Sequence, residues 1–348
     1  MSQKDTIKGI TINIGNTHNL KDYNAGVKPR NDIIKTLTRL NFINLNINYE
    51  GYKISLKESL KFTRDIFKVY NFIKKHPDLP IIIQYPGYRF GIFGIKILIK
   101  VINSKNIYFL IHDINSLRYN FEISEEEINI LKKAKGLLVH TDNMKQYLIK
   151  KNVVVPMFVM NLFDYYIKDK INNKNIYDNS IVFAGNLNKS EFLKKNTNLF
   201  SPYILHLYGL QPNYELNSNH IYEGKFEPDE VSEIKGNWGL VWDGDSIETC
   251  SGSIGEYLKY NIPYKLCMYI SAEKPIIIWD KSGLANYVIE NQIGFTVSNL
   301  HEVKTKLDQI NEDEYNNIKN NIRNLKNKLI NGLILENLIK ENINNFSN

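Results

Sequence analysis

Residues 262–280, IPYKLCMYISAEKPIIIWD, decide how the fold is interpreted. An apolar run with helical character stops at Glu273-Lys274-Pro275, and the segment after it has the length and β-branched content of a buried strand. Lys265 lies in the first turn of that helix, although the rest of the helix is suited to burial. A lysine there adds its charge to the exposed N–H groups of the helix N-terminus, so we expect it to meet an anionic ligand.

The same alternation of strand and helix extends in both directions. Towards the N-terminus we expect strands at 9–15, 42–48, 79–86, 106–113 and 136–141, and helices at 31–41, 55–75, 89–103, 124–134 and 142–152. Towards the C-terminus we expect strands at 180–186, 201–209, 220–226, 237–246, 275–280 and 294–299, and helices at 252–260, 264–272, 282–291 and 312–343. Buried strands that alternate with helices indicate α/β architecture, with mostly parallel sheets covered on both faces.

The length of 348 residues favours two domains, because single cores seldom grow beyond roughly 250–300 residues. The periodicity is lost in an Asn-, Lys- and Asp-rich stretch after residue 157 and then restarts. We therefore predict two doubly wound Rossmann-like domains that face a cleft. Their expected limits are 1–160, a linker at 161–179, a second domain at 180–311 and a helical segment at 312–348 that packs back on the first domain.

The charge is divided unevenly between the two halves. Residues 1–170 hold 27 Lys and Arg against 15 Asp and Glu, a net charge of +12; the chain's totals of 44 and 37 leave 17 against 22, a net charge of −5. This asymmetry indicates two domains with different partners. Basic surface suits nucleic acid, phospholipid or an anionic lipid-linked acceptor. We expect no nucleic acid, because no helix-turn-helix, zinc-finger or RNA-binding aromatic motif is present.

The cysteine and histidine content predicts neither a disulfide framework nor a metal centre. Cys250 and Cys267 are the two cysteines, and the seven histidines do not pair with one another or with cysteine at short spacing. The N-terminal residues lack the sustained apolar core of a signal peptide. We therefore expect a reducing, cytoplasmic location.

The most apolar run, at 88–102, is too short to span a bilayer and carries Arg89, Lys96 and Lys100. One interpretation is a packed helix with a charged outer edge. The other is a basic helix that faces a membrane, which would place the protein at the inner face of the membrane as a peripheral partner.

Polar residues and glycine gather where strands of the second half end, which is where doubly wound sheets bind ligands. They are Gly185, Asn186, Lys189, Asp243, Asp245 and Ser246. Glycine lets a backbone approach a phosphate closely, although the first two residues could form only a tight turn. The Asp-Gly-Asp stretch resembles a metal-binding motif, but a turn with hydrogen-bonding carboxylates is the simpler interpretation, so we expect no metal. The sequence has neither a dinucleotide fingerprint GxGxxG nor a Walker loop.

A resemblance follows from these segments. The run containing Pro263, Lys265, Tyr269 and Pro275 resembles the donor-binding segment of nucleotide-sugar glycosyltransferases with two Rossmann-like domains, the GT-B fold. Together with FAGN (183–186), GLVWDGDS (239–246) and GEYLKYN (255–261), it is similar to one narrower group. That group holds the glucosyltransferases that extend O-linked N-acetylglucosamine on bacterial serine-rich adhesins, and the related β-1,6-galactofuranosyltransferases of cell-surface polysaccharides. LKDYNAGVKPRNDI (20–33) is similar to a glycine loop of the galactofuranosyl branch, and the resemblance covers nearly the whole chain.

The resemblance implies that residues 1–160 bind an acceptor and residues 180–311 a UDP-sugar. We assign to the UDP-sugar Gly185, Asn186, Lys189, Phe226, Asp243, Asp245, Ser246, Tyr264 and Lys265. We assign to a loop facing donor sugar and acceptor Asn24, Gly26, Lys28 and Asp32, and we add Tyr85 and Pro86, which either line the acceptor path or only pack. Many members of the wider superfamily have a ribose-binding glutamate where this chain has Met268, so the ribose contacts must come from elsewhere.

Glycosyl transfer requires a neutralised leaving diphosphate and, for inversion, a base. Lys189 and Lys265 can supply the neutralising charge without a metal or other cofactor. We predict that Asp113 is this base, because it ends a buried strand and desolvation could raise the pKa of its carboxyl towards neutrality. The alternative is that Asp113 caps a helix or accepts a structural hydrogen bond. His112 beside it should point to the opposite face of the strand. Lys28 and Arg30 could be solvated surface residues.

We therefore expect a UDP-sugar-dependent hexosyltransferase that moves glucose or galactofuranose to a hydroxyl of a protein- or lipid-linked glycan containing N-acetylglucosamine. The alternatives are a non-catalytic scaffold partner of a glycosylation complex and a basic nucleic-acid-binding protein. The resemblance also implies a homo-oligomer, either a dimer or a tetramer. The sequence does not indicate the sugar, the acceptor, the linkage or the stereochemical outcome.

Overall fold

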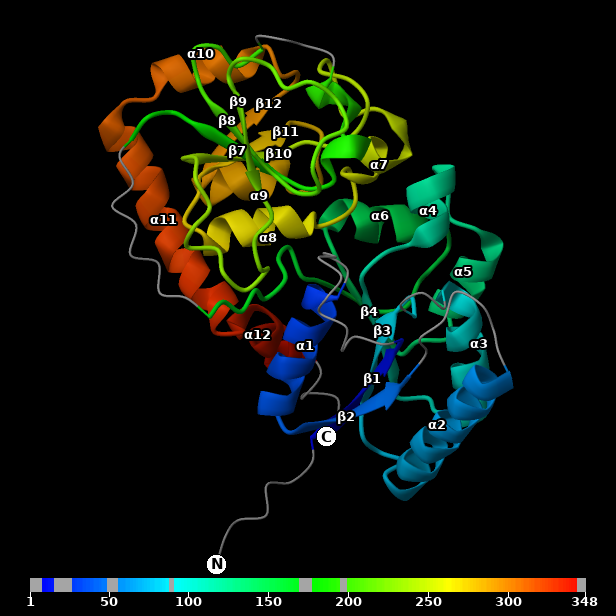
Figure 1. The fold of residues 1–348 in the computed structure, drawn as a ribbon. Helices are drawn as coiled ribbons and strands as arrows, with labels where there is room; N and C mark the ends of the chain where they lie inside the picture. Colours follow the sequence, from blue (N-terminus) through cyan, green and yellow to red (C-terminus); the bar gives the residue numbers. More distant parts are fainter. Residues whose placement is uncertain are drawn as a thin grey trace, which may run out of the picture. The chain divides into compact units, whose positions relative to one another are not determined.

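The fold consists of two α/β units. The computed structural model describes residues 8–15, 27–48, 56–87, 91–168, 177–194 and 199–342. The first unit comprises Met1–Met160 with Ile334–Asn348, and the second comprises Asn161–Leu333. Each contains a six-stranded sheet with parallel strand pairs and flanking helices (Figure 1). The predicted doubly wound α/β architecture is confirmed.

The sheet of the first unit has the strand order β2-β1-β3-β4-β5-β6. The strands are β1 (Gly9–Ile14), β2 (Phe42–Ile47), β3 (Ile81–Tyr85), β4 (Ile107–Ile111), β5 (Gly136–Val139) and β6 (Met157–Val159). β1, β3, β4 and β5 are buried along their whole length, as expected of strands covered on both faces. The three-residue β6 was not predicted, because it lies where the sequence loses its periodicity.

The helices of the first unit are α1 (Lys28–Arg39), α2 (Leu56–Lys75), α3 (Gly91–Ile102), α4 (Asn115–Asn120), α5 (Glu125–Leu131), α6 (Asp142–Lys150) and α12 (Leu333–Asn342), which starts at the boundary between the units. The predicted serine cap of α5 is confirmed, since the Ser124 side chain accepts a hydrogen bond from the Glu127 N–H. The short α4 was not predicted.

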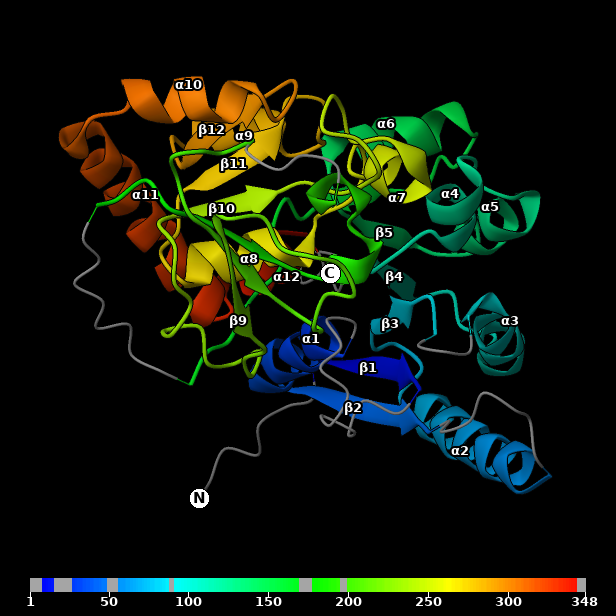
Figure 2. The ribbon, with the colours of Figure 1, turned by 45° about the horizontal axis from the view of Figure 1, so that its top comes forward.

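The sheet of the second unit has the order β12-β11-β10-β7-β8-β9, and Figure 2 shows β10, β11 and β12 in succession. The strands are β7 (Ile181–Ala184), β8 (Leu205–Tyr208), β9 (His220–Gly224), β10 (Trp238–Val241), β11 (Ile276–Trp279) and β12 (Gly294–Val297). The helices are η1 (Leu187–Lys189), η2 (Glu191–Leu193), α7 (Gly252–Tyr257), α8 (Tyr264–Ser271), α9 (Ala285–Glu290), α10 (Glu302–Gln309) and α11 (Glu312–Ile330). The order of this sheet reverses between β7 and β10.

The helical segment predicted at 312–348 is divided between the two units. α11 packs against α8 in the second unit, where Arg323 and Lys326 both pair with Glu273. The helix ends at Ile330, and Gly332 adopts a positive φ of 68° before α12 begins. α12 lies in the first unit, where Glu336 pairs with Arg39 of α1.

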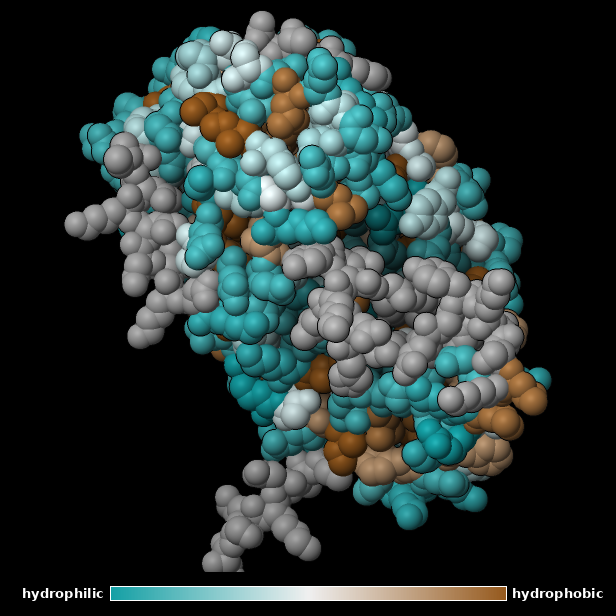
Figure 3. All heavy atoms as spheres, viewed as in Figure 1, coloured by the Kyte–Doolittle hydropathy of each residue, from teal (hydrophilic) through white to brown (hydrophobic). Residues whose placement is uncertain are grey.

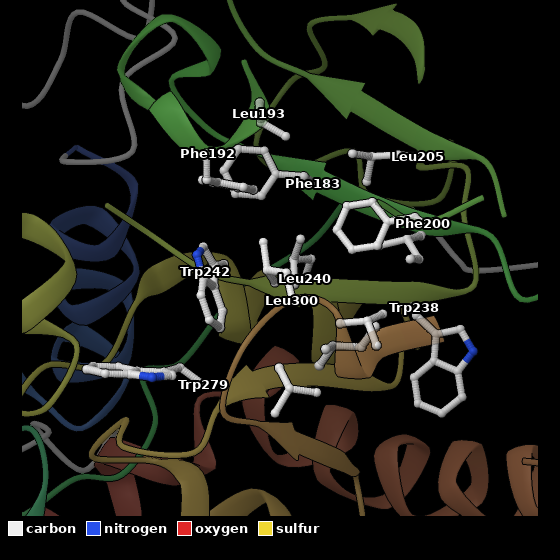
Figure 4. Packing of buried hydrophobic residues seen from close by; sticks show 14 of the residues in the cluster. Phe183, Phe192, Leu193, Phe200, Leu205, Trp238, Leu240, Trp242, Trp279 and Leu300 are labelled. Carbon is white, nitrogen blue, oxygen red and sulfur yellow. The ribbon is translucent and has the colours of Figure 1, made fainter. Parts of the chain in front are cut away.

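The core of the second unit includes residues at the carboxyl ends of β7 and β10. Trp238, Trp242 and Trp279 are fully buried in it (Figure 4). The Phe183 ring packs edge-on against Phe192, with 5.2 Å between the ring centroids. The start of the predicted linker is part of this unit, because the Tyr165 hydroxyl donates to the Pro228 carbonyl.

Candidate functional site

The reversal of strand order between β7 and β10 sets the position of the site in the second unit. Connections from two such neighbouring strands leave towards opposite sides, and doubly wound sheets bind ligands at the carboxyl ends of these strands. Gly185 follows β7, and Trp242 with Asp243 follows β10. The predicted binding residues Gly185 and Asp243 therefore lie at the point where a doubly wound sheet binds its ligand.

Lys265 joins the two strand ends. Its Nζ lies 2.7 Å from Asp243 Oδ1, 3.2 Å from the Trp242 carbonyl oxygen and 4.5 Å from the centroid of the Phe183 ring. A Cβ on Gly185 would lie 3.9 Å from the same Nζ. The structure thus brings together residues predicted from three separate segments, and Lys265 is not simply an unpaired cation waiting for a ligand.

The position of Lys265 is fixed by the packing of α8. The Tyr269 hydroxyl accepts a hydrogen bond of 2.8 Å from the Ala184 N–H, which ties α8 to the end of β7. The Tyr269 ring also covers Gly239, where a Cβ would lie 2.4 Å from the ring. Burial raises the pKa of Tyr269, so its hydroxyl stays protonated. α8 is thereby held against both β7 and β10.

Asn186 and Lys189 form a capped turn after β7. The Asn186 side-chain oxygen accepts from the Lys189 N–H at 3.2 Å and so caps η1. The Gly185 N–H donates to the Tyr208 carbonyl of the neighbouring strand. The Lys189 side chain is exposed. Asn186 therefore shapes the turn after β7, and its contact with a UDP-sugar stays a prediction.

Asp245 and Ser246 belong to the tight loop after β10. The Ser246 carbonyl accepts from Trp242 Nε1 at 2.9 Å, and the Ser246 hydroxyl accepts from the Glu248 N–H. A Cβ on Gly252 would lie 2.7 Å from an Asp245 carboxylate oxygen. In the part of the chain that the structure describes, no group of three His, Cys, Asp or Glu residues is arranged to hold a metal.

Two predicted aromatic residues flank the segments described above. The Phe226 ring meets Tyr208, at the end of β8, almost perpendicularly, with 5.4 Å between centroids. Tyr264, the first residue of α8, lies 4.9 Å from the ring of Tyr165 and 6.0 Å from that of Phe163. Phe226 and Tyr264 are both half-buried.

A buried polar network lies at the reversal point of the first sheet, between β1 and β3. The Arg30 guanidinium donates to the Pro86 carbonyl at 2.6 Å and to Asn13 Oδ1 at 3.3 Å. The Gln84 amide donates to the Arg30 carbonyl, and Gln84 Oε1 lies 2.7 Å from His112 Nε2. Arg30 is only 3% exposed. The interpretation of Arg30 as a solvated residue is wrong.

Lys28 is also buried, where it pairs with Asp32 one helical turn away at 3.0 Å. The solvated interpretation is therefore wrong for Lys28 too. Its neighbours in the predicted loop, Asn24 and Gly26, lie outside the described residues.

Tyr85 is fully buried, and its hydroxyl donates to Glu127 Oε1 at 2.7 Å. Its ring lies 5.4 Å from that of Phe109 in the next strand. Burial of Tyr85 supports a packing role for this tyrosine rather than a position along the acceptor path. Pro86 contributes its carbonyl to the Arg30 network described above.

Asp113, the predicted base, follows β4 and pairs with Arg118 at 2.9 Å. Burial raises the pKa of Asp113, and the charges of Arg118 and Arg30 oppose that increase. Burial, followed by the charge of Arg30, lowers the pKa of His112 well below its ordinary value. At neutral pH the strand end therefore carries a neutral imidazole beside a carboxyl of raised pKa.

Sequence reasoning missed the Arg30 network, although a signal was present. Asn13 and Gln84 are polar residues within otherwise apolar strands, and both lie near the carboxyl ends of neighbouring strands. Phe183 and Trp242 lie in segments that carry the family resemblance, but neither was assigned to the site, because an aromatic residue in an apolar strand is more often part of the core.

Family models match most of the chain. The N-terminal domain model of the glucosyltransferase 3-like family matches residues 11–162, and the C-terminal domain model matches residues 181–342.

Curated relatives agree with this match. The chain is 31% identical over 239 residues to a β-1,6-galactofuranosyltransferase of Escherichia coli K12, covering 67% of this chain and 69% of that protein. It is 23% identical over 320 residues to glucosyltransferase 3 of Streptococcus gordonii, covering 90% and 92%.

Solved structures share the fold. Sucrose-phosphate synthase of Thermosynechococcus elongatus superposes with a TM-score of 0.61 at 14% identity, covering 95% of this chain and 98% of that one. The HepE protein of Anabaena, solved in complex with UDP, superposes with a TM-score of 0.60 at 11% identity, covering 97% and 100%. The chain therefore belongs to the glucosyltransferase 3-like family and is a glycosyltransferase with the GT-B fold.

Proposed function

We propose that this glycosyltransferase moves a hexose, either glucose or galactofuranose, from a UDP-sugar to a hydroxyl of a protein- or lipid-linked glycan that contains N-acetylglucosamine. The observation that carries the proposal is the cluster of Lys265, Asp243 and Gly185 at the strand-order reversal of the second unit. The choice of sugars is supported by the names of the two curated relatives.

In this proposal the diphosphate lies over Gly185 and the first turn of α8. An ammonium has three N–H donors, and two of those on Lys265 are directed at Asp243 and the Trp242 carbonyl. The third can donate to a phosphate oxygen. The N-terminus of α8, where Pro263 provides no side-chain cap, adds a favourable dipole.

Charge neutralisation by Lys265, with Lys189 at the rim, replaces a metal in this mechanism. As the bond from the sugar to the phosphate breaks, negative charge grows on the leaving diphosphate, and a fixed ammonium stabilises that charge. Asp243 then serves to orient Lys265 and to accept hydrogen bonds from the sugar.

Asp113 stays our proposed base for the acceptor hydroxyl. The proton of that hydroxyl passes to the carboxylate as the new glycosidic bond forms, and the diphosphate departs with the electron pair of the broken bond. The raised pKa of Asp113 favours proton uptake, whereas its pair with Arg118 holds the carboxylate in place.

The test combines calorimetric titration with UDP and transfer assays over a panel of UDP-sugars, using acceptors that carry N-acetylglucosamine. Lys265→Ala should weaken UDP binding by at least about tenfold, because a charge-assisted hydrogen bond is lost. Lys304→Ala on α10, which removes a lysine side chain that is 44% exposed, is the matched control and should bind as the wild type does. Equal UDP binding by Lys265→Ala and the wild type would overturn the proposed phosphate site, and absence of UDP binding by the wild type would favour the scaffold alternative.

A further inference from the structure

Helix α2 exposes large apolar side chains along its outer face. Leu56, Leu60 and Phe67 are 81%, 64% and 61% exposed. Their spacing of four and seven residues places them on the same side of the helix. In contrast, Phe62, Ile66, Val69 and Ile73 of the same helix are buried. The exposed residues thus form a second apolar stripe that the core of the first unit does not use.

Helix α3, which packs beside α2, continues the apolar surface. Phe93 and Val101 are exposed on it, two turns apart. Figure 3 shows hydrophobic residues gathering over α2 and α3 on the face in view. Single exposed apolar residues are common on proteins, but several on two adjacent helices indicate an interaction surface. We call these exposed residues of α2 and α3 the α2–α3 face.

Basic residues interleave with the apolar ones on this face. The exposed charged residues of the two helices are Arg64, Lys68, Lys74, Lys75, Lys96 and Lys100. Among the side chains described on α2 and α3, no exposed one is acidic; Asp65 is buried and Glu58 is half-buried. Glu126 of the neighbouring α5 pairs with Lys96, and Asp65 pairs with Arg64 and Lys68, so the described charges of the face are net positive but partly paired.

The combination of positive charge and apolar side chains indicates which partner binds the α2–α3 face. A second copy of the chain would bring the same positive charge against this face, so symmetric pairing through it is disfavoured. An anionic bilayer matches both components, because Leu and Phe side chains enter the acyl boundary while Lys and Arg contact lipid phosphates. None of the helices that the structure describes combines the length and apolarity needed to cross a bilayer.

We propose that the α2–α3 face docks the protein on the surface of an anionic phospholipid bilayer. The helices lie along the interface, with Leu56, Leu60, Phe67 and Phe93 inserted and Arg64 and Lys68 at the level of the headgroups. Docking of this kind needs both components, because either one alone gives weak, reversible attachment. The proposal rests on the first unit and does not depend on the donor site of the second.

Sedimentation with vesicles tests the proposal on the full chain. Vesicles of phosphatidylcholine are compared with vesicles that contain about 30 mol% phosphatidylglycerol, at low and high salt. The wild type should bind the anionic vesicles at least about tenfold more tightly, and salt should weaken that binding. Leu60→Ser with Phe67→Ser, and separately Arg64→Gln with Lys68→Gln, should each reduce binding by about tenfold or more.

Matched controls in the second unit are Ile254→Ser with Ile289→Ser, which removes exposed apolar residues, and Lys281→Gln with Lys328→Gln, which removes exposed charges. Both should bind vesicles as the wild type does, and circular dichroism should show that all variants are folded. Absence of vesicle binding, equal binding to both lipid compositions, or equal losses in the controls would overturn the proposal. It would also be overturned if the α2 variants dissociated an oligomer in sedimentation equilibrium while leaving vesicle binding intact. Titration with UDP separates the two proposals, since the α2 variants should keep the donor affinity of the wild type.

Discussion

At the scale of single residues, the pairing of Lys265 with Asp243 affects how tightly the proposed site binds a phosphate. A carboxylate 2.7 Å from an ammonium competes with an incoming phosphate for that ammonium. The pair is partly buried, with 14% and 23% of the two side chains exposed, so water screens it only in part. Asp243 therefore opposes binding of the bare nucleotide while holding Lys265 in place.

Asp243→Asn should separate these two effects. Without the negative charge we expect UDP to bind about tenfold more tightly, because the ligand no longer approaches a carboxylate. Transfer from a UDP-sugar should nevertheless slow, since Asp243 is proposed to orient Lys265 and the sugar. Calorimetry with UDP and initial rates with the UDP-sugar measure the two quantities. Weaker UDP binding in the variant would contradict our view of Asp243 as a competitor.

His140 makes the stability of the protein depend on pH. Its Nε2 lies 2.8 Å from the Ile111 carbonyl oxygen in the core, and burial lowers its pKa from 6.5 to about 4. Below pH 6.5 His140 is protonated in the unfolded chain but stays neutral in the folded protein, so the free energy of unfolding falls as the pH drops towards 4. Between pH 7 and pH 5 the loss from this one group is on the order of 2 kcal/mol.

His140→Gln should remove that part of the pH dependence, as measured by urea unfolding at pH 7 and pH 5. His112, whose pKa burial also lowers, contributes with the same sign, so some slope should persist in the His140 variant. An identical slope in the variant and the wild type would show that His140 is already accessible to protons in the folded state.

At the scale of elements, the sequence predicted the strands well and the connections poorly. A strand such as β11 is buried on both faces of the sheet, which requires a continuous run of apolar residues, and such a run can be recognised in the sequence. α10 was missed, because its short polar turns carry little periodicity. Strand order depends on long-range pairing, so the sequence could not show that β7 lies beside β10, nor that Lys265 would bridge them.

The burial of Lys28 and Arg30 was unpredictable for a related reason. Both residues look like solvated charges in a polar stretch, and their partners are either one helical turn away or on strands distant in the sequence. Burial of a guanidinium is costly unless its donors are hydrogen-bonded, and here the Pro86 carbonyl and Asn13 accept two of the Arg30 N–H groups. The pattern of one segment cannot reveal such a three-segment arrangement.

The backbone of the loop after β10 can be tested by substituting Gly244, with Gly224 as the control. Gly244 has φ of 107°, and a Cβ there would lie 2.2 Å from the Ser251 carbonyl oxygen. Gly224 at the end of β9 has φ of 89°, with nothing within 4 Å of a Cβ. Gly224→Ala should therefore cost only the conformational term, roughly 1 kcal/mol, whereas Gly244→Ala should cost roughly 2–3 kcal/mol more.

Thermal unfolding measures both glycine variants, and initial transfer rates with a UDP-sugar show whether the loop still positions Asp243. We expect the transfer rate to fall in Gly244→Ala and to be preserved in Gly224→Ala. Equal destabilisation by the two substitutions would mean that the loop relaxes around the new methyl group. In that case the backbone of the loop would not be what positions Asp243.

At the scale of the whole molecule, the chain passes from the first unit to the second and returns at its end. Ile334–Asn348 belongs to the first unit, in which Leu335 and Ile339 are buried and Glu336 pairs with Arg39. The first unit is therefore completed only after the second has been synthesised. Its stability should depend on α12, whereas the donor site depends on elements between β7 and α8.

Ile339→Asp tests this division of the chain. An unpaired carboxylate at a fully buried position should destabilise the first unit by several kcal/mol, while the second unit keeps its fold and its affinity for UDP. Differential scanning calorimetry should show one transition moved to lower temperature and a second that UDP still raises. Asn337→Asp, which adds the same charge at an exposed position of the same helix, should leave both transitions in place. If Ile339→Asp lowered both transitions together, the two units would unfold as one cooperative body, and the return of the chain would stabilise the donor site as well as the first sheet.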